Sequence, residues 1–189
     1  MIKSKKIIST YFFNTQKIIT SLDMIQINKL VEIIDKVRKN SKTLYIAGNG
    51  GSASTASHFA ADLGVGSLAR ANPVKAISLC DNLSVITAIS NDFEYELIFE
   101  KQLKLLGEAG DLLIVISASG NSKNLVQAIK VAQAMGITIF SLTGFDGGKV
   151  KKITSDNNIH IPTSIGEYGL VEDTHLAICH VVTDCIRAQ

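Results

Sequence analysis

Five short apolar segments, separated by stretches of helical character, constrain the fold of this chain more than any other feature. Each segment is mostly apolar, as expected of strands that are buried on both faces of a sheet. Strands that alternate with helices predict an α/β fold with a parallel, doubly wound sheet, in which ligands bind at the carboxyl ends of the strands. The predicted strands are 43–47, 74–79, 111–116, 137–142 and 157–161, and the predicted helices are about 52–64, 82–90, 94–106, 121–135, 147–152 and 168–188.

A pair of helices is predicted ahead of the first strand. Residues 4–40 contain no Gly or Pro, and their apolar residues recur at helical spacing, with a break near residues 21–23. We expect the apolar first helix to cover the domain or to pack against a second subunit.

The composition limits the classes of function. The 189 residues suffice for one domain with a sizeable core, and the 46% hydrophobic and 19% charged shares indicate a globular protein. The net charge of +2 is too small to favour nucleic acid as a partner. Cys80, Cys179 and Cys185 form no CxxC pair, which fits a reducing compartment, and no apolar run reaches transmembrane length. We therefore expect a cytoplasmic protein with no membrane partner.

Residues 48–62, GNGGSASTASHFAAD, follow the first predicted strand and carry much of the chemistry. Glycines let the backbone approach a ligand closely, and the free N–H groups at the start of a helix attract phosphates. His58 and Asp62 are four residues apart, so both point from one face of the predicted helix. An isolated pair of this kind is more often an exposed surface pair, but this helix begins at the expected ligand site.

A second group of histidines and carboxylates, Glu172, Asp173, His175 and His180, lies in the last predicted helix. Imidazole and carboxylate ligands suit zinc or another first-row divalent metal. In a continuous helix Glu172 and His180 are about 12 Å apart along the axis and differ by about 80° in direction. They share one metal only if Glu172 precedes the helix; otherwise each serves a different site that another subunit completes. His175 and His180 point to opposed sides, and we favour His180.

A serine-rich loop, SASGNS from Ser117 to Ser122, follows the third predicted strand. It offers three hydroxyls and the free N–H groups of the next helix, and it contains no Lys or Arg. Because one capping residue would suffice to begin a helix, we interpret the loop as a phosphate site built from hydroxyls, amides and the helix dipole. It is expected at the same sheet edge as the GNGG segment.

Other patterns are weaker. The GxGxxA pattern at 48–53 matches a dinucleotide fingerprint, but the acidic candidate Asp81 lies too far along the chain, and no GxxxxGK[ST] phosphate loop occurs. Asn91-Asp92 by itself indicates an Asx turn at the start of the next helix. Residues 143–148 are interpreted as a turn only, and His160 as structural.

These motifs resemble the SIS (sugar isomerase) fold and, within it, the phosphoheptose isomerases. The likeness spans nearly the whole chain: the N-terminal helical pair, GNGGSAS, HFAAD, ISNDF (89–93), GDLLIVISASGNS (110–122), LTGFDGGK (142–149) and the final helix. It implies a single SIS domain over 1–189, with helices for packing or oligomerisation in 1–40 and a flavodoxin-like core with a five-stranded parallel sheet in 41–189. It also implies a homotetramer whose active sites lie between subunits.

The resemblance also implies residue roles. Asp62 and His180 fall on the catalytic acid/base positions, and His58, Asp62, Glu172 and His180 on the positions that hold a metal, expected to be one zinc per subunit. The implied reaction converts sedoheptulose 7-phosphate to D-glycero-D-manno-heptose 7-phosphate through an enediol, the first step of ADP- or GDP-heptose synthesis for lipopolysaccharide or capsule. The implied substrate-binding residues, which replace the Asx-turn interpretation of Asp92, are Asn49, Gly50, Gly51, Ser52, Asp62, Asn91, Asp92, Ser117, Ala118, Ser119, Ser122 and Glu172.

Three positions depart from the family pattern. The family normally has Glu where this chain has Asp62, Gln where it has Glu172, and Arg where it has Leu170. The added negative charge of Glu172 should favour a divalent cation, and the changes leave open a different sugar phosphate from a surface-polysaccharide pathway. The alternative function is a non-catalytic SIS protein that binds the replication initiator or senses a sugar phosphate. Retention of the two histidines and of a carboxylate at position 62 favours the enzyme.

Overall fold

A five-stranded parallel sheet with the order β2-β1-β3-β4-β5 forms the centre of the computed structural model, which describes residues 2–189. The register pairs Gly48 with Ile116 and Ser117 with Thr143, so β1, β3 and β4 end close together. The predicted sheet is confirmed. The strands are β1 (Thr43–Gly48), β2 (Lys75–Ser78), β3 (Leu112–Ser117), β4 (Thr138–Gly144) and β5 (Asn158–Ile161).

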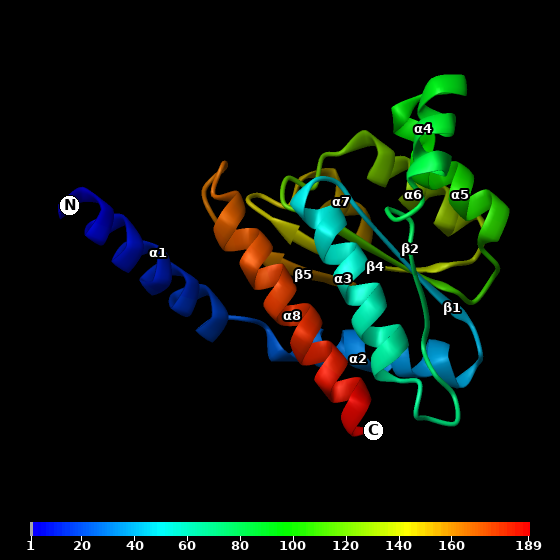
Figure 1. Cartoon of the computed structure of the whole chain (residues 1–189), viewed down its shortest axis with the longest axis horizontal. Coiled ribbons are helices and arrows are strands. Elements are labelled where there is room, and N and C mark those ends of the chain that lie inside the picture. Colours follow the sequence, from blue (N-terminus) through cyan, green and yellow to red (C-terminus); the bar gives the residue numbers. More distant parts are fainter. Residues whose placement is uncertain (1) are drawn as a thin grey trace.

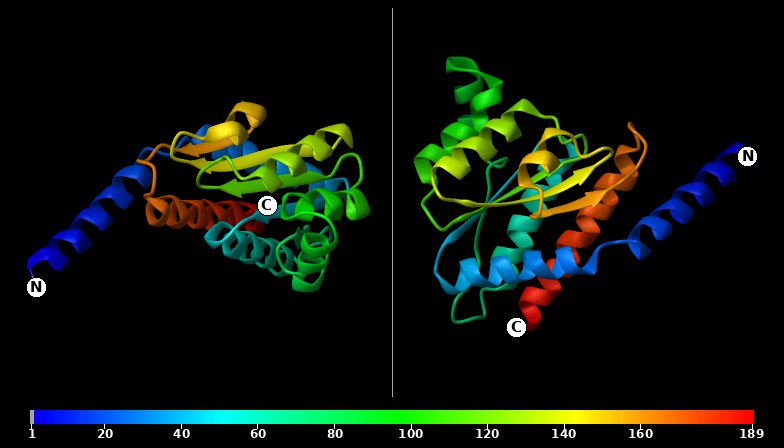
Figure 2. Two further views of the ribbon diagram at one scale, coloured as in Figure 1. Left: turned by 90° about the horizontal axis from the view of Figure 1, so that it is seen from above. Right: turned by 180° about the vertical axis from the view of Figure 1, so that it is seen from behind.

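Helices cover both faces of the sheet (Figures 1 and 2). Alternate residues of each strand face opposite sides: Leu112 and Ile114 pack with one group of helices, and Leu113 and Val115 with the other. The first group is α2 (Met24–Lys39), α3 (Gly51–Gly66) and α8 (Tyr168–Ala188); the second is α5 (Ile98–Leu106), α6 (Lys123–Ala134) and α7 (Gly148–Thr154).

Two helices lie at the periphery of the molecule. Helix α1 (Ile2–Thr20) projects away from the sheet, and α4 (Leu83–Asp92) stands out at the opposite side and buries none of its residues (Figure 1). The predicted break between the first two helices ends at Asp23, which is the N-cap residue of α2. Its side chain accepts hydrogen bonds from the N–H groups of Ile25 and Gln26. None of the described helices is long and apolar enough to cross a membrane.

Element boundaries agree with the sequence-based expectation to within two residues, with one exception. The predicted helix 94–106 is divided into a 3₁₀ turn, η1 (Tyr95–Leu97), and α5. Asn91 and Asp92 form the end of α4 rather than the start of the next helix, so the interpretation as an Asx turn that begins a helix is wrong.

Candidate active site

Helices α3 and α8 run side by side on one face of the sheet (Figure 1). They bring three side chains together. His58 and Asp62 lie one turn apart on α3, with His58 Nε2 3.1 Å from Asp62 Oδ2. From α8, His180 Nε2 lies 3.0 Å from His58 Nε2 and 3.8 Å from Asp62 Oδ2. The side chains are 48%, 30% and 50% exposed respectively, so the cluster is open to a ligand.

These three side chains fit a divalent metal ion. One ligand atom from each lies within 4.8 Å of the others. Among the described residues, this is the group of three or more His, Cys, Asp or Glu side chains whose ligand atoms come that close together. A tetrahedral zinc with bonds of about 2.0–2.1 Å would place its ligand atoms roughly 3.3 Å apart, close to the separations found here. Two imidazoles and a carboxylate leave a fourth position for water or substrate.

Glu172 stands apart from this cluster. Helix α8 is continuous from Tyr168, so Glu172 is helical and lies two turns from His180. This is the separation expected for two residues eight apart in a continuous helix. Its carboxylate instead rests against the first turn of α3, where a Cβ on Gly51 would come within 2.4 Å of Glu172 Oε2. The positive end of the α3 dipole favours an anion there. A ligand role for Glu172 therefore stays a prediction.

The serine-rich loop connects β3 to α6 and folds on itself through its hydroxyls. Ser117 Oγ accepts a hydrogen bond from the N–H of Gly120 at 3.0 Å, and Ser119 Oγ accepts one from the N–H of Asn121 at 3.3 Å. Ser122 is the N-cap residue of α6, yet its hydroxyl makes no capping bond within the described chain. The first turn of α6 thus keeps N–H groups that can bind an anion.

The turn after β4 supports this loop. The N–H of Gly144 donates to Ala118 O at 3.1 Å, and the N–H of Val150 donates to Gly120 O at 2.9 Å. Gly120 has φ +62°, and a Cβ there would lie 2.0 Å from Gly147 O, so only glycine allows this approach. Residues 143–148 were expected to be a turn only; they also support the serine-rich loop, which sequence spacing did not reveal.

The side chain of Asn49, which directly follows β1, is hydrogen-bonded to the first turn of α6. Its amide pairs reciprocally with that of Asn124, with both N···O distances at 2.9 Å, and its Oδ1 also accepts a hydrogen bond from the Tyr95 hydroxyl at 2.8 Å. Asn124 is buried, whereas Tyr95 is exposed. Sequence reasoning missed both partners, because Asn and Tyr at these positions carry no motif of their own.

The remaining predicted residues surround this region less closely. Gly50 has φ +56° and is the N-cap residue of α3, and Ser52 is buried in its first turn. Asn91 and Asp92 are exposed at the end of α4, where the Asn91 amide donates to Asp92 Oδ1 at 2.8 Å. No described contact joins this pair to the His58, Asp62 and His180 cluster.

The other two histidines lie inside the fold. His175 is fully buried, neither ring nitrogen has a hydrogen-bond partner within residues 2–189, and burial lowers its pKa to about 4. His160 Nδ1 lies 3.1 Å from Thr143 Oγ1, and partial burial lowers its pKa. These positions agree with the preference for His180 and with a structural His160.

Comparison with known proteins identifies the family. The SIS domain model matches residues 10–144. A phosphoheptose isomerase of Helicobacter pylori strain P12 is 39% identical over 88% of this chain and 86% of its own, and a probable phosphoheptose isomerase of Thermoplasma acidophilum is 34% identical over 84% and 87%. The solved phosphoheptose isomerase of Neisseria gonorrhoeae superposes with a TM-score of 0.87 at 29% identity, over 99% of this chain and 98% of that one.

These likenesses cover both the sheet and the helices that carry the candidate site. The matched region of the SIS model includes β1, α3 and the serine-rich loop, and the sequence relatives extend over more than four fifths of the chain. The chain therefore belongs to the SIS-domain family of phosphoheptose isomerases, which are sugar isomerases.

Proposed function

We propose that this protein isomerises sedoheptulose 7-phosphate to D-glycero-D-manno-heptose 7-phosphate, which would feed the synthesis of nucleotide-activated heptose for lipopolysaccharide or capsule. The convergence of His58, Asp62 and His180 carries this proposal, because isomerisation of a hydroxy-ketone needs groups that move protons at adjacent atoms. His58 lies seven residues, or about 10 Å of helix, beyond Gly51 at the start of α3. That separation suits a long sugar phosphate better than a short one.

The serine-rich loop would hold the phosphate. Its three hydroxyls and the N–H groups at the start of α6 donate to phosphate oxygens, and the helix dipole adds a favourable field. No Lys or Arg occurs between Ser117 and Ser122, so binding rests on neutral donors. The phosphate is the same in substrate and product, so these donors would bind both alike.

Proton transfer would fall to Asp62 and His180, whose nearest atoms are 3.8 Å apart. One group removes the C1 proton of the ketose while the C2 oxygen gains a proton, which gives the enediol. The proton then returns to C2, and loss of the O1 proton forms the aldehyde. Atoms balance without an oxidant, because C1 is oxidised as C2 is reduced.

A zinc ion, one per subunit, would be held by His58, Asp62 and His180. Because Glu172 lies two turns from His180 on α8, it would act as the predicted further ligand only toward the site of a neighbouring subunit. When bound, a divalent cation would polarise the substrate carbonyl and lower the energy of the enediolate. The carboxylate of Glu172, which lies against Gly51 at the start of α3, adds negative charge near the ends of these helices, which favours a cation there.

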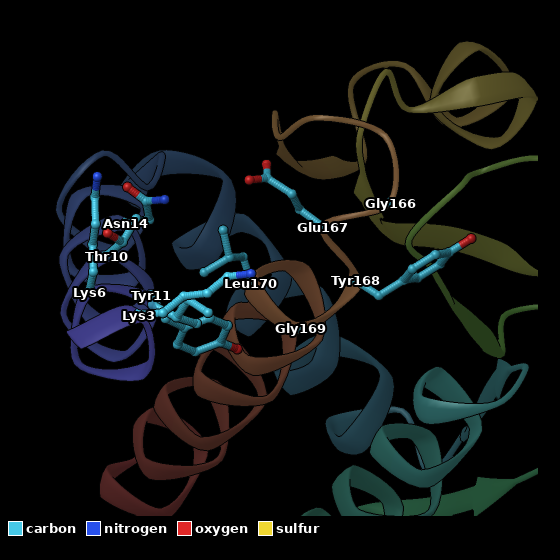
Figure 3. Close-up of a pocket in the computed structure, with 11 residues that line it drawn as sticks. Lys3, Lys6, Thr10, Tyr11, Asn14, Gly166, Glu167, Tyr168, Gly169 and Leu170 are labelled. Atoms are coloured by element: carbon cyan, nitrogen blue, oxygen red, sulfur yellow. The ribbon is translucent and has the colours of Figure 1, made fainter. Parts of the chain in front are cut away.

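Assembly would complete the site. Apolar side chains of α1 such as Ile7, Phe12 and Phe13 are more than 60% exposed, and an apolar surface of this kind favours an interface. A cavity of about 560 Å³ lies between α1 and residues 166–170. Figure 3 shows the residues that line it, among them Lys3, Lys6, Thr10, Tyr11 and Asn14 of α1.

We infer that residues 1–189 form one SIS domain and that four copies associate, with active sites between subunits. The Tyr11 hydroxyl donates a hydrogen bond to Asp173 at 2.5 Å, which connects α1 to the start of α8. This hydrogen bond raises the pKa of Tyr11 to about 12. Three unpaired cysteines fit a cytoplasmic location.

A coupled assay of the purified protein with sedoheptulose 7-phosphate tests the proposed reaction. We expect conversion to the aldose, loss of activity after chelation, and recovery when zinc is restored. Metal analysis of the purified protein should give about one ion per subunit. Absence of aldose with or without zinc would contradict the proposal, and a pull-down with the replication initiator would then test the non-catalytic alternative.

A further inference from the structure

We propose that Tyr95 and Asn124 are positioning residues that lock the Asn49 side-chain amide in one orientation, so that it offers the substrate a hydrogen-bond donor and no acceptor. This inference rests on the proposed function, because Asn49 is an expected substrate contact. It assigns a role to two side chains outside the recognised motifs.

A backbone group fixes the direction of the whole network. The N–H of Leu125 donates to Asn124 Oδ1 at 2.9 Å, and a backbone N–H can only donate. Asn124 Oδ1 therefore faces Leu125 and the Asn49 nitrogen, and Asn124 Nδ2 faces Asn49 Oδ1. The bond from the Leu125 N–H therefore fixes which atom of each side-chain amide is the oxygen and which is the nitrogen.

The acceptor capacity of Asn49 is then used up. A carbonyl oxygen has two lone pairs, and Asn49 Oδ1 accepts from both Asn124 Nδ2 and the Tyr95 hydroxyl. Its nitrogen carries two hydrogens, of which one is given to Asn124 Oδ1. Within residues 2–189 the second hydrogen has no described acceptor. Asn49 can thus donate to a sugar oxygen, whether hydroxyl or carbonyl, but cannot accept from a sugar hydroxyl.

The same pair connects the two halves of the site. Asn49 lies between β1 and α3, and Asn124 is buried in the first turn of α6, directly after the serine-rich loop. Tyr95 approaches from η1, which is further joined to α6 by the ion pair between Glu96 and Lys123 at 2.7 Å. A donor held at this junction sits between the phosphate loop and the start of α3, where the carbon chain of the substrate would pass.

A double-mutant cycle tests the role of Tyr95. We expect Tyr95→Phe to lower kcat/KM for sedoheptulose 7-phosphate about five- to tenfold, the scale of one hydrogen bond, and to have no effect in the Asn49→Ala background. Tyr95 is exposed, so the variant should fold normally. Tyr45→Phe is the matched control: it removes the hydroxyl bond to Leu106 O and should change kcat/KM equally little in both backgrounds.

A second readout is independent of turnover. In ¹⁵N-labelled protein, the side-chain amide of Asn49 should show slow rotation in the wild type and faster rotation in Tyr95→Phe and Asn124→Ser. If the wild type fails to convert the heptose phosphate, the proposed function is lost, yet this measurement still decides whether the amide is locked. The inference would be overturned if Tyr95→Phe lowered kcat/KM equally in the wild-type and Asn49→Ala backgrounds. It would also be overturned if the rotation rate of the Asn49 amide were the same in the wild type and in the variants.

Discussion

Asp62 and His180 belong to different helices, yet each is within 4 Å of the same neighbour, His58. All three are partly exposed, and none contributes to the buried core. Side chains of this kind are free to serve a ligand because the fold does not depend on them. Their substitution should therefore separate activity from stability.

Asp62→Asn and His180→Ala should each reduce turnover of sedoheptulose 7-phosphate at least about a hundredfold, as expected when an acid or base is lost. Thermal unfolding should change little in either variant, since both side chains are solvent-accessible. Asp184→Ala is a suitable control on α8, because its carboxylate is 77% exposed and pairs only with nearby Arg187 at 3.7 Å among the described contacts. Turnover close to the wild type in either test variant would remove that residue from the mechanism.

At the level of elements, the serine-rich loop owes its shape to the turn that follows the neighbouring strand. Gly144, Gly147 and Val150 all lie against its backbone. Two backbone hydrogen bonds, and one from the N–H of Lys149 to Asn121 Oδ1, join the segments. Loop and turn therefore act as one unit, although α6 and most of β4 lie between them in the sequence. A substitution in either should disturb phosphate binding.

Gly120→Ala should destabilise the protein and raise KM for the sugar phosphate at least about tenfold, or about 1.4 kcal/mol. Its Cβ would lie 2.0 Å from Gly147 O and displace the turn. Gly136→Ala is the matched control, since its φ of +71° carries similar backbone strain, about 1 kcal/mol, but its nearest contact would be an ordinary 3.5 Å. Chemical denaturation and steady-state kinetics compare the two. Equal KM values for Gly120→Ala and Gly136→Ala would show that the contact between Gly120 and the turn is unimportant for binding the sugar phosphate.

For the whole molecule, α1 is the element that its own chain covers least. Phe12 and Phe13 are 67% and 66% exposed, whereas α2 buries Leu30 and Ile34 completely. An amphipathic helix gains most of its stability by burying an apolar face. The exposed face of α1 is therefore where the proposed tetramer should depend most on side-chain burial.

Replacing Phe12 and Phe13 together by Ser should shift the protein from a tetramer to smaller species, because the apolar area that would be buried between subunits is lost. Light scattering after size-exclusion chromatography gives the mass directly. Lys5→Ser, a polar change on the same helix, should leave the mass unchanged. A tetramer that survives the double substitution would place the main interface elsewhere.

The stability of the fold should also depend on pH through His175. Its pKa is lowered to about 4 by burial, so between pH 6.5 and pH 4 the unfolded chain binds a proton that the folded chain does not. The free energy of unfolding should therefore fall by roughly 2 kcal/mol from pH 7 to pH 5. Half-buried His160 adds a contribution of the same sign.

Urea unfolding at the two pH values measures this change. His175→Leu replaces the imidazole by an apolar side chain and should remove most of the loss at pH 5. His58 and His180 are present in both proteins and cancel in the comparison. An equal loss of stability in the wild type and in His175→Leu would contradict the assignment to His175.

Much of this protein is determined by its sequence alone. Short apolar runs such as 112–116 have no polar face, so they fit only strands covered on both sides, and helices between them force a parallel sheet. The i, i+4 spacing of His58 and Asp62 places them on one helical face regardless of tertiary structure. The same helical geometry separates Glu172 from His180, and α8 keeps them two turns apart.

Tertiary structure alone decided which distant residues meet. Only the packing of α3 against α8 brings His180 rather than His175 to His58, and buries His175 instead. Only the register of β1, β3 and β4 brings Asn49 to Asn124 and the turn at 144–148 to Gly120. Sequence patterns record local periodicity, whereas these contacts arise from the twist and spacing of the sheet, which no single segment encodes.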